Sequence, residues 1–147
     1  RVSRSGPILP VNVKTMPHPG FPTDMQPQMA TMLCCAGGTS IVSEGVWDNR
    51  FKYVDELRKM GANIQVDGKV AVIEGVERLT GAPVRALDLR AGAAMLIAGL
   101  MADGRTEVED IHHIERGYSD LVEKLNRLGA EIRKVPCTEL EAERALS

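Results

Sequence analysis

Aromatic residues are scarce in this sequence of 147 residues, which contains one Trp, two Tyr and two Phe. Proteins that bind single-stranded nucleic acids stack bases on aromatic side chains, and those that hold a phosphate backbone carry an excess of Lys and Arg. Here 18 Lys and Arg face 20 Asp and Glu, which gives a net charge of −2. Both signals are missing, so we expect no nucleic-acid partner.

Long apolar runs are also missing. A membrane-spanning helix needs about 20 apolar residues, whereas the longest candidate, residues 91–102, is short and contains Gly92 and Gly99. We therefore expect no membrane segment. The opening letters RVSRSGPILP lack the apolar core of a signal peptide, and the first residue is Arg1 rather than Met, so we expect the chain to begin inside a longer protein.

Cysteine is rare: Cys34 and Cys35 are adjacent, and Cys137 lies near the end. This spacing forms neither a CxxC metal pair nor an even disulfide framework, which favours the reducing cytoplasm as the location. Cys34 and Cys35 fall on an apolar segment, where core packing is more common than a nucleophilic role. The sequence has no GxxxxGK[ST] or strand-linked GxGxxG motif, so nucleotide hydrolysis by a P-loop and Rossmann cofactor binding are disfavoured.

The sequence does contain an internal repeat. Asp24 and the small, apolar segment after it align with Asp88 and its following segment, DNRF aligns with ERGY, and DELRKMGANIQV aligns with EKLNRLGAEIRKV. The offset between aligned residues grows from 64 to 68 along the copy, as two small insertions would produce. We expect two copies of one fold unit, over about residues 14–80 and 81–136, and a tail at residues 137–147.

Hydrophobic periodicity predicts the elements of each copy. Apolar helices are expected over residues 25–35 and 90–101, and β-branched runs at 39–42 and 106–108 predict short strands after them. A second helix in each copy is indicated by apolar residues at i, i+4 and i+7, namely Tyr53, Leu57 and Met60 in the first copy and Leu121, Leu125 and Leu128 in the second.

A β-hairpin is predicted after the second helix of the first copy. Ile64 and Val66 alternate with polar residues, Asp67-Gly68 suits a tight turn, and residues 70–73 are apolar. The repeating unit is therefore predicted to be helix, strand, helix, hairpin. Such units expose apolar faces that they bury only against each other, so the fold class is α/β, or α+β, built from repeats.

Asp24 ends the proline-rich segment PHPGFPTD, immediately before the first predicted helix. Proline restricts the backbone around it, so Asp24 is expected at a fixed position. Two interpretations stay open for this residue. Capping preference favours an N-cap aspartate, and the alternative is a carboxylate that accepts a proton from a hydroxyl as general base.

Asp88-Leu89-Arg90 is the equivalent segment of the second copy. An arginine beside the N–H groups of a helix start is a good site for a phosphate or carboxylate group, which makes Arg90 a candidate anion ligand. The alternative is a capping Asp88 with a solvated Arg90.

The segment HHIERGY contains a second candidate anion ligand, Arg116, whose repeat counterpart is Arg50. For Arg50 itself we favour an ion pair. His112 and His113 are expected on an extended segment, with side chains on opposite sides, and no third ligand recurs at a metal-like spacing. A zinc site is therefore disfavoured.

Six sequence words occur in a fixed order along the chain: FPTDMQPQ, DNRF, YVDELRKMGA, GVERLTGAPV, DLRAGAAMLIAGL and HHIERGYSDLVEKLNRLGA. Together they resemble the C-terminal part of the UDP-N-acetylglucosamine 1-carboxyvinyltransferases, the enolpyruvyl transferases of peptidoglycan synthesis, over residues 11–135. The resemblance implies an inside-out α/β barrel of two domains with three helix-and-sheet repeats each, of which this chain holds two repeats. A catalytic lysine and the loop whose cysteine is attacked by fosfomycin would belong to a missing N-terminal part.

The resemblance also implies an activity. The enolpyruvyl group of phosphoenolpyruvate is transferred to the 3-hydroxyl of UDP-N-acetylglucosamine, and phosphate is released through a tetrahedral addition intermediate. This is the first committed step of cell-wall peptidoglycan synthesis, and it implies two small-molecule substrates with no metal or organic cofactor. The chain alone is expected to be inactive, because both domains must close on the substrates.

Residue roles follow by matching the motifs. Asp24 of FPTD resembles the base that contacts the sugar hydroxyl, and Val46 of EGVWDNRF resembles a backbone contact with the nucleotide sugar. Arg90 of DLRA and Arg116 of HIERGY resemble the arginines that hold the carboxylate and phosphate of phosphoenolpyruvate. Asp88 resembles the acid that orients the reacting groups.

Two other functions stay open. Enolpyruvyl transferases that act on shikimate 3-phosphate share the implied architecture, although FPTDMQ and HHIERGY favour the nucleotide-sugar enzymes. A noncatalytic repeat module that serves as a binding scaffold is the second alternative. It is disfavoured by the joint presence of Asp24, Arg90 and Arg116 on the loops that open the units.

Overall fold

The computed structural model describes residues 3–136 and 138–139. The chain forms two compact units, residues 1–117 and 118–147. The boundary between them falls inside the second predicted repeat, whose limits stay a prediction. Most of the predicted tail, including Cys137, lies outside the described residues.

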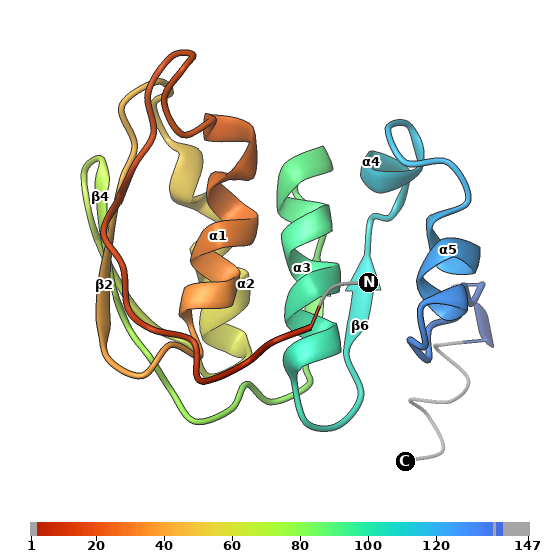
Figure 1. Ribbon diagram of the computed structural model, residues 1–147. Helices are drawn as coiled ribbons and strands as arrows, with labels where there is room; N and C mark the ends of the chain where they lie inside the picture. Colours follow the sequence, from red (N-terminus) through yellow and green to blue (C-terminus); the bar gives the residue numbers. More distant parts are fainter. Residues whose placement is uncertain (1–2, 137, 140–147) are drawn as a thin grey trace. The chain divides into compact units, whose positions relative to one another are not determined.

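A four-stranded sheet forms one layer of the first unit (Figure 1). Its strands are β1 (Val13–Lys14), β2 (Thr39–Ser43), β3 (Asn63–Asp67) and β4 (Val70–Glu74), in the order β1-β2-β4-β3. β1 runs parallel to β2, and the other neighbouring strands are antiparallel. Successive side chains of a strand point to opposite faces, so β2 and β4 bury alternate residues in the core.

The hairpin predicted for the first copy is confirmed. β3 and β4 pair up to Asp67 and Val70, which leaves Gly68 and Lys69 as the connecting loop. Gly68 has a φ of 54°, a conformation that glycine adopts freely because it has no Cβ. The loop therefore begins one residue later than the Asp67-Gly68 pair suggested.

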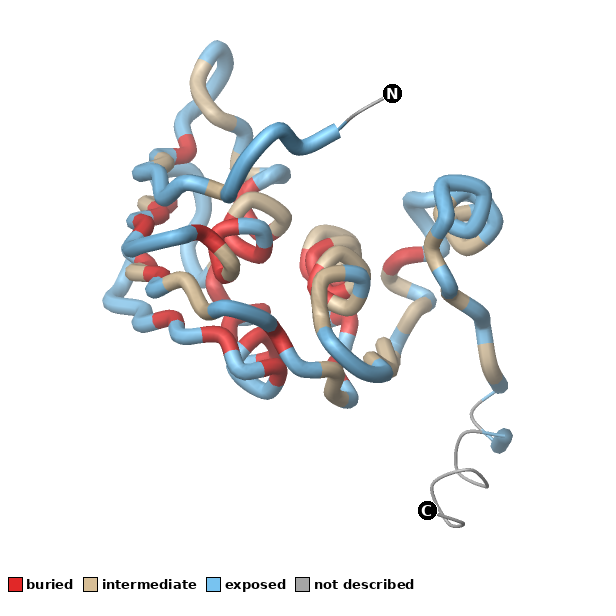
Figure 2. Tube along the Cα trace, turned by 60° about the horizontal axis from the view of Figure 1, so that its bottom comes forward, coloured by how far each residue is buried: buried red, intermediate tan, exposed pale blue. Residues whose placement is uncertain are grey.

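Helices α1 (Gln26–Leu33) and α2 (Val54–Lys59) cover one face of this sheet, and α3 (Leu89–Met101) packs against α1 (Figure 1). Short 3-10 turns, Thr23–Met25 and Arg50–Tyr53, lead into α1 and α2. The core lies between these layers, where Figure 2 shows the buried segments gathered. Its large, fully buried apolar side chains are Tyr53, Leu33, Leu57, Met60, Ile73, Leu79, Met95, Val42, Val54 and Val84.

The helices of the first unit lie where periodicity predicts them. α1 and α3 match the expected ranges 25–35 and 90–101 within two residues at each end, which is the usual uncertainty of helix ends. The stripe of Tyr53, Leu57 and Met60 is confirmed, since at most 2% of each residue is exposed.

Beside α3, β5 (Pro83–Arg85) and β6 (Glu107–Glu109) form a parallel two-stranded sheet, and α4 (His112–Glu115) follows β6. α4 packs against α3. A Cβ on Gly92 of α3 would collide with the side chain of Ile114. Glycine at this position therefore permits the close approach of the two helices.

The second unit contains α5 (Leu121–Arg127), the helix that the second apolar stripe predicts. This stripe is poorly buried, and Leu128 is 85% exposed. The expected second hairpin is not formed in the described part of the unit, because residues 129–136 contain no strand. An isolated hairpin is marginal in water. The first hairpin pairs with β2 and packs under two helices, whereas the described second unit offers it only α5.

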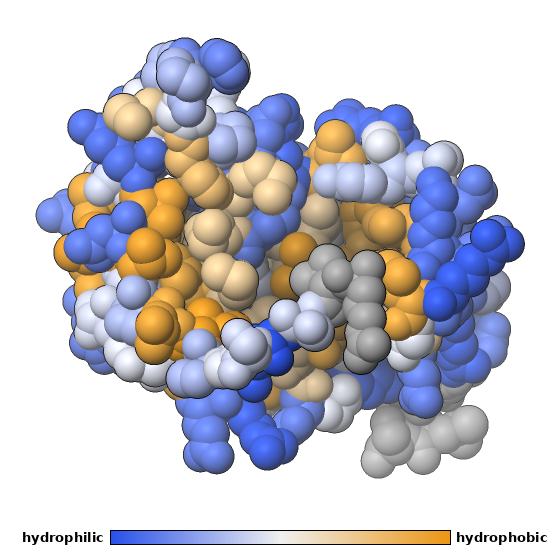
Figure 3. Space-filling view, viewed as in Figure 1, coloured by the Kyte–Doolittle hydropathy of each residue, from blue (hydrophilic) through white to orange (hydrophobic). Residues whose placement is uncertain are grey.

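Apolar side chains also reach the surface of the first unit, and Figure 3 shows orange and tan side chains over its α1 side. Met25, Met32 and Leu100 keep 51, 37 and 49% of their surface exposed. Every helix in the described residues is too short or too polar to cross a lipid bilayer.

Candidate functional site

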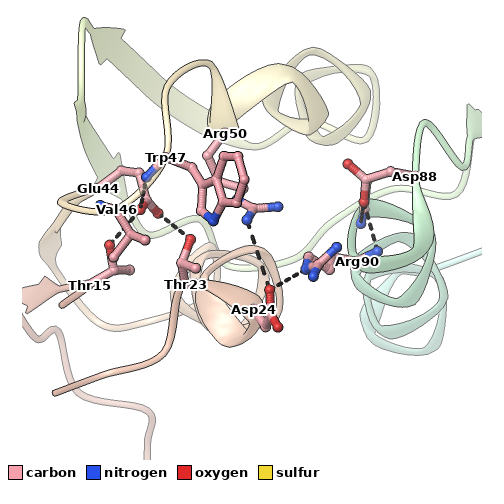
Figure 4. Close-up of polar contacts among 10 residues, drawn as sticks. Thr15, Thr23, Asp24, Glu44, Val46, Trp47, Arg50, Asp88 and Arg90 are labelled. Carbon is pink, nitrogen blue, oxygen red and sulfur yellow. Dashed lines mark hydrogen bonds and ion pairs between the residues drawn. The ribbon is translucent and has the colours of Figure 1, made fainter. Parts of the chain in front are cut away.

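The first turns of α1 and α3, together with residues 47–53, surround an open pocket of about 360 Å³. The lining residues are Pro27, Trp47, Asp48, Asn49, Arg50, Lys52, Tyr53, Leu87, Asp88, Arg90 and Ala91. Asp24 lies at its edge, between Arg50 and Arg90 (Figure 4). The structure therefore gathers three of the five predicted site residues, Asp24, Asp88 and Arg90, at one place.

Asp24 lies in the 3-10 turn before α1 and pairs with two arginines. Its Oδ1 accepts a hydrogen bond from Nε of Arg90 and lies 3.9 Å from Nη2 of Arg50. The capping interpretation of Asp24 is wrong, since the N-cap position of α1 is Met25 and no side chain caps this helix. Pro27 in the first turn has no N–H to offer, which removes one of the usual partners of a capping carboxylate.

The hydrogen bond from Arg90 lowers the pKa of Asp24 below its ordinary value, and the positive charges of Arg90 and Arg50 act in the same direction. Partial burial opposes this shift and is outweighed. The carboxylate is therefore ionised at neutral pH, and 60% of its side chain is exposed. An ionised, accessible carboxylate can accept a hydrogen bond from the hydroxyl of a bound molecule.

Arg50 lies deeper than Asp24, with 12% of its side chain exposed. Its guanidinium carbon is 5.7 Å from the ring centroid of Trp47, within the range of a cation–π contact. Its buried Nε has no hydrogen-bond partner among the described residues. The ion pair expected for Arg50 is confirmed by its approach to Asp24, but the residue also lines the pocket, which the repeat pattern alone did not reveal.

Asp88 is the N-cap of α3, so the capping interpretation is confirmed for this aspartate. Its Oδ1 accepts hydrogen bonds from the backbone N–H of Arg90 at 2.7 Å and of Ala91 at 2.9 Å. These bonds fix the first turn of α3, from which the Arg90 side chain reaches Asp24 (Figure 4). Arg90 keeps 37% of its side chain exposed, but its guanidinium group is also engaged by Asp24, which the alternative of a solvated arginine did not include.

Val46, the predicted backbone contact, is not among the residues that line the pocket. Its N–H donates to Oε1 of Glu44 at 2.9 Å, and the N–H of Trp47 donates to the same oxygen at 3.0 Å. Glu44 has no role in the sequence-based hypothesis, although it is 3% exposed. The sequence signal is the position of Glu44 directly after β2, where the alternation of buried residues predicts a buried side chain. Carboxylates are rarely buried without partners, so a glutamate at this position indicates a hydrogen-bonded role.

Arg116 follows α4 and is exposed. It is absent from the pocket lining, so its role as an anion ligand stays a prediction. Its repeat counterpart Arg50 is largely buried beside Asp24, and the two arginines therefore have different environments despite their equivalent positions.

His112 and His113 belong to helix α4, and their ring centroids are 4.1 Å apart. The expectation of side chains on opposite sides is wrong, because successive residues of a helix are about 100° apart rather than the 180° of a strand. In the part of the chain that the structure describes, no three His, Cys, Asp or Glu side chains gather as a metal site would require.

Cys34 is fully buried at the end of α1, as core packing predicts. Burial raises the pKa of its thiol to about 12, and burial also raises the pKa of Cys35. Both thiols are therefore protonated at neutral pH, which makes them poor nucleophiles.

Comparison with known proteins gives consistent matches. The family model of EPSP synthase (3-phosphoshikimate 1-carboxyvinyltransferase) matches residues 2–125. A UDP-N-acetylglucosamine 1-carboxyvinyltransferase of Desulfofundulus thermocisternus is 56% identical, and the match covers 95% of this chain and 57% of that protein. UDP-N-acetylglucosamine 1-carboxyvinyltransferase 1 of Clostridium perfringens is 59% identical over 87% of this chain and 30% of its own length. The chain thus spans only part of these relatives.

Two solved structures show the same fold. The enolpyruvyl transferase NikO of Streptomyces tendae has a TM-score of 0.80 and 39% identity, over 88% of this chain and 30% of its own. EPSP synthase of Acinetobacter baumannii has a TM-score of 0.57 and 23% identity, over 76% of this chain and 26% of its own. These neighbours confirm the expected α/β fold class, and the chain covers only part of their fold.

Proposed function

The chain belongs to the EPSP synthase family, and on that premise we propose that it takes part in transferring the enolpyruvyl group of phosphoenolpyruvate to the 3-hydroxyl of UDP-N-acetylglucosamine. Phosphate is released, and the product enters peptidoglycan synthesis in the cytoplasm. The relatives that carry this activity in their names are 56 and 59% identical to the chain. That identity favours the nucleotide sugar as acceptor over shikimate 3-phosphate.

One observation of the site carries the proposal: Asp24, Arg50 and Arg90 meet beside a single pocket. The transfer needs a base for the acceptor hydroxyl and fixed cations for a trianionic donor. The ionised carboxylate of Asp24 supplies the base, and the guanidinium groups of Arg50 and Arg90 supply the cations.

In the proposed reaction, the 3-hydroxyl oxygen forms a bond to C2 of phosphoenolpyruvate while its proton passes to Asp24. The methylene carbon takes up one proton, and it loses one again as phosphate leaves and the double bond is restored. Arg50 and Arg90 stabilise the negative charge of the donor throughout.

Arg90 holds Asp24 before any substrate binds. A carboxylate or phosphate group of the donor competes for the same guanidinium group. Donor binding would therefore release Oδ1 of Asp24 to the acceptor hydroxyl and increase its basicity, because the hydrogen bond from Arg90 is the main cause of its lowered pKa. Binding of the donor anion and the basicity of Asp24 are therefore coupled through Arg90.

The remaining predicted residues take supporting roles in the proposal. Asp88 holds the turn from which Arg90 extends and faces the same pocket, where it orients the reacting groups. The carbonyl group of Val46 contacts the nucleotide sugar, since its N–H is engaged by Glu44. Arg116 holds the donor anion together with Arg90, as its motif implies.

We further propose the domain organisation predicted from the repeat. Residues 14–80 and 81–136 are two repeats of one enolpyruvyl transferase domain, and residues 137–147 are a tail without a role in the chemistry. The part of the relatives that this chain does not cover supplies the third repeat of that domain and the second domain. The chain alone then shows no phosphate release, because closure of two domains brings donor and acceptor together.

The chain matches 30% of the length of the Clostridium perfringens relative. The proposal is tested by fusing the chain to the N-terminal part of that relative. Phosphate release from phosphoenolpyruvate is measured with UDP-N-acetylglucosamine or shikimate 3-phosphate as acceptor. We expect release from the fusion with the nucleotide sugar only, and none from the chain by itself. Release with shikimate 3-phosphate would assign the other acceptor, and release with neither would favour a noncatalytic module.

A further inference from the structure

Glu44 connects two segments of the first unit and lies outside the pocket lining. Its Oε1 accepts a hydrogen bond from Oγ1 of Thr15 at 2.7 Å, and its Oε2 accepts one from Oγ1 of Thr23 at 3.0 Å. With the N–H groups of Val46 and Trp47, the carboxylate accepts four hydrogen bonds. Two of them come from the chain before α1 and two from the chain after β2.

Both segments lead directly to the proposed site. Thr23 immediately precedes Asp24 in the 3-10 turn. Trp47 is fixed at its N–H by Glu44, and its ring contacts the guanidinium group of Arg50, which lies 3.9 Å from Asp24. Figure 4 shows this path from the Glu44 carboxylate to both Asp24 and Arg50.

The Glu44 carboxylate is both buried and ionised. Burial acts to raise its pKa, but the hydrogen bonds from Thr15, from the Trp47 and Val46 amides and from Thr23 outweigh burial and lower the pKa below its ordinary value. A carboxylate offers only acceptor positions, so it suits four donors better than an amide or a protonated acid does. Thr15 is aligned for this bond, because its Oγ1 already accepts the N–H of Gly45 at 2.8 Å.

We propose that Glu44 is a positioning residue. Its buried carboxylate fixes residues 45–50 against the turn that carries Asp24, and so sets the placement of Arg50 and Asp24 relative to each other. The proposal deepens the proposed function, and its kinetic consequence rests on that function. Its structural consequence concerns this chain alone.

Trp47 gives a direct test, because it is the one tryptophan of the sequence. In Glu44→Gln an uncharged amide of the same shape replaces the carboxylate, so the Val46 and Trp47 N–H groups lose their ionised acceptor and keep at most a neutral carbonyl oxygen, whose hydrogen bonds are about half as strong. We expect the fluorescence anisotropy of Trp47 to fall by roughly a fifth or more, and exchange of the Val46 and Trp47 amide hydrogens to accelerate about tenfold, with an unchanged far-UV circular dichroism spectrum.

Glu74→Gln is the matched control. Glu74 accepts a side-chain hydrogen bond from Asn63 at 2.7 Å on the exposed surface of the hairpin, so this variant should leave the Trp47 signal unchanged. If Glu44→Gln does not fold, Thr23→Val removes one donor to the same carboxylate and keeps the side-chain shape. An unchanged Trp47 signal in the folded variant, Glu44→Gln or Thr23→Val, would overturn the proposal.

The kinetic consequence is measured in the fused enzyme described above. We expect Glu44→Gln to lower kcat about tenfold while KM for UDP-N-acetylglucosamine changes less than about threefold. A purely structural role would reduce stability and leave kcat of the folded enzyme unchanged. If the unsubstituted fusion releases no phosphate, the proposed function fails, and the Trp47 measurements on the chain alone still decide the positioning role.

Discussion

Asp24 and Asp88 align with each other in the predicted repeats, each just before an apolar helix, yet their carboxylates bind different partners. Asp88 accepts the first N–H groups of its own helix, whereas Asp24 accepts the side chain of Arg90 from the other helix. The helix starts explain the difference: Pro27 lacks an N–H in α1, while Arg90 and Ala91 each donate one in α3. Asp88 stabilises the start of α3 and also lines the pocket, whereas Asp24 lies at the edge of the pocket as an ion-paired, exposed carboxylate.

The two aspartates are nevertheless connected through one residue. Asp88 binds the backbone N–H of Arg90, and Asp24 binds its side chain. The cap of α3 therefore positions the guanidinium group that holds Asp24. Two helix starts that align in the sequence thus use the same residue type differently: Asp88 accepts backbone N–H groups, and Asp24 accepts a guanidinium group.

The largest expected effect separates the two acids by activity. In the fused enzyme, Asp24→Asn should lower kcat about 100-fold or more, because an amide does not accept the proton of the acceptor hydroxyl. Its free energy of unfolding should change by less than about 1 kcal/mol, because the Asp24–Arg90 pair is partly exposed and Arg50 lies at the longer distance of 3.9 Å. Steady-state phosphate release and urea unfolding measure both quantities.

Asp103→Asn is the control for this substitution, since Asp103 forms a comparable exposed ion pair with Arg78 at 3.0 Å, and neither residue lines the pocket. It should retain the unsubstituted kcat. An Asp24→Asn enzyme with full activity would show that this carboxylate is not the base.

The second expected effect concerns stability, for which Asp88 should matter more than Asp24. Asp88→Ala should lower the free energy of unfolding by about 1 kcal/mol, as loss of an N-cap does. Asp88→Asn should keep most of that stability, because an asparagine oxygen also caps, but it should reduce kcat if Asp88 orients the reacting groups. Full stability in Asp88→Ala would contradict the capping role, and full kcat in Asp88→Asn would restrict Asp88 to it.

The third effect tests the residue that joins the two acids. Arg90→Gln should raise the pKa of Asp24 towards its ordinary value, because the hydrogen bond from Arg90 is the main cause of the lowering. A titration of the Asp24 carboxyl carbon by NMR measures this shift. Arg78→Gln is the matched control and should leave Asp24 unaffected, and an unchanged pKa in Arg90→Gln would exclude the pairing in solution.

Local patterns were sufficient to predict much of this fold. The helices α1 and α3, the stripe of Tyr53, Leu57 and Met60 and the hairpin all follow from periodicity and turn chemistry within a few residues. Burial of the second stripe and formation of a second hairpin depend on neighbouring layers. A local pattern does not report whether those layers are present.

The sequence predicted part of the candidate site, Asp24, Asp88 and Arg90, but not the contacts among these residues. Motif matching selected Asp24 and Arg90, but their hydrogen bond joins positions 66 residues apart, and no sequence spacing indicates such a bond. Glu44 was missed for a related reason, since its donors Thr15 and Thr23 come from a segment more than 20 residues away. Periodicity identifies faces of elements, whereas polar contacts between elements depend on tertiary packing.

The smallest expected effect is the pH dependence of the Asp24 pair. The folded-state pKa of Asp24 lies below its unfolded value, so the pair stabilises the chain above the unfolded value and loses this contribution as pH falls through the folded value. Because both side chains are partly exposed, the contribution is only about 0.2–1 kcal/mol. The difference in unfolding free energy between the chain and Asp24→Asn should therefore have this size at neutral pH and vanish in strong acid. Asp103→Asn shows how an ion pair outside the site responds to the same change in pH. A difference for Asp24→Asn that is independent of pH would mean that the carboxylate acts through its shape rather than its charge.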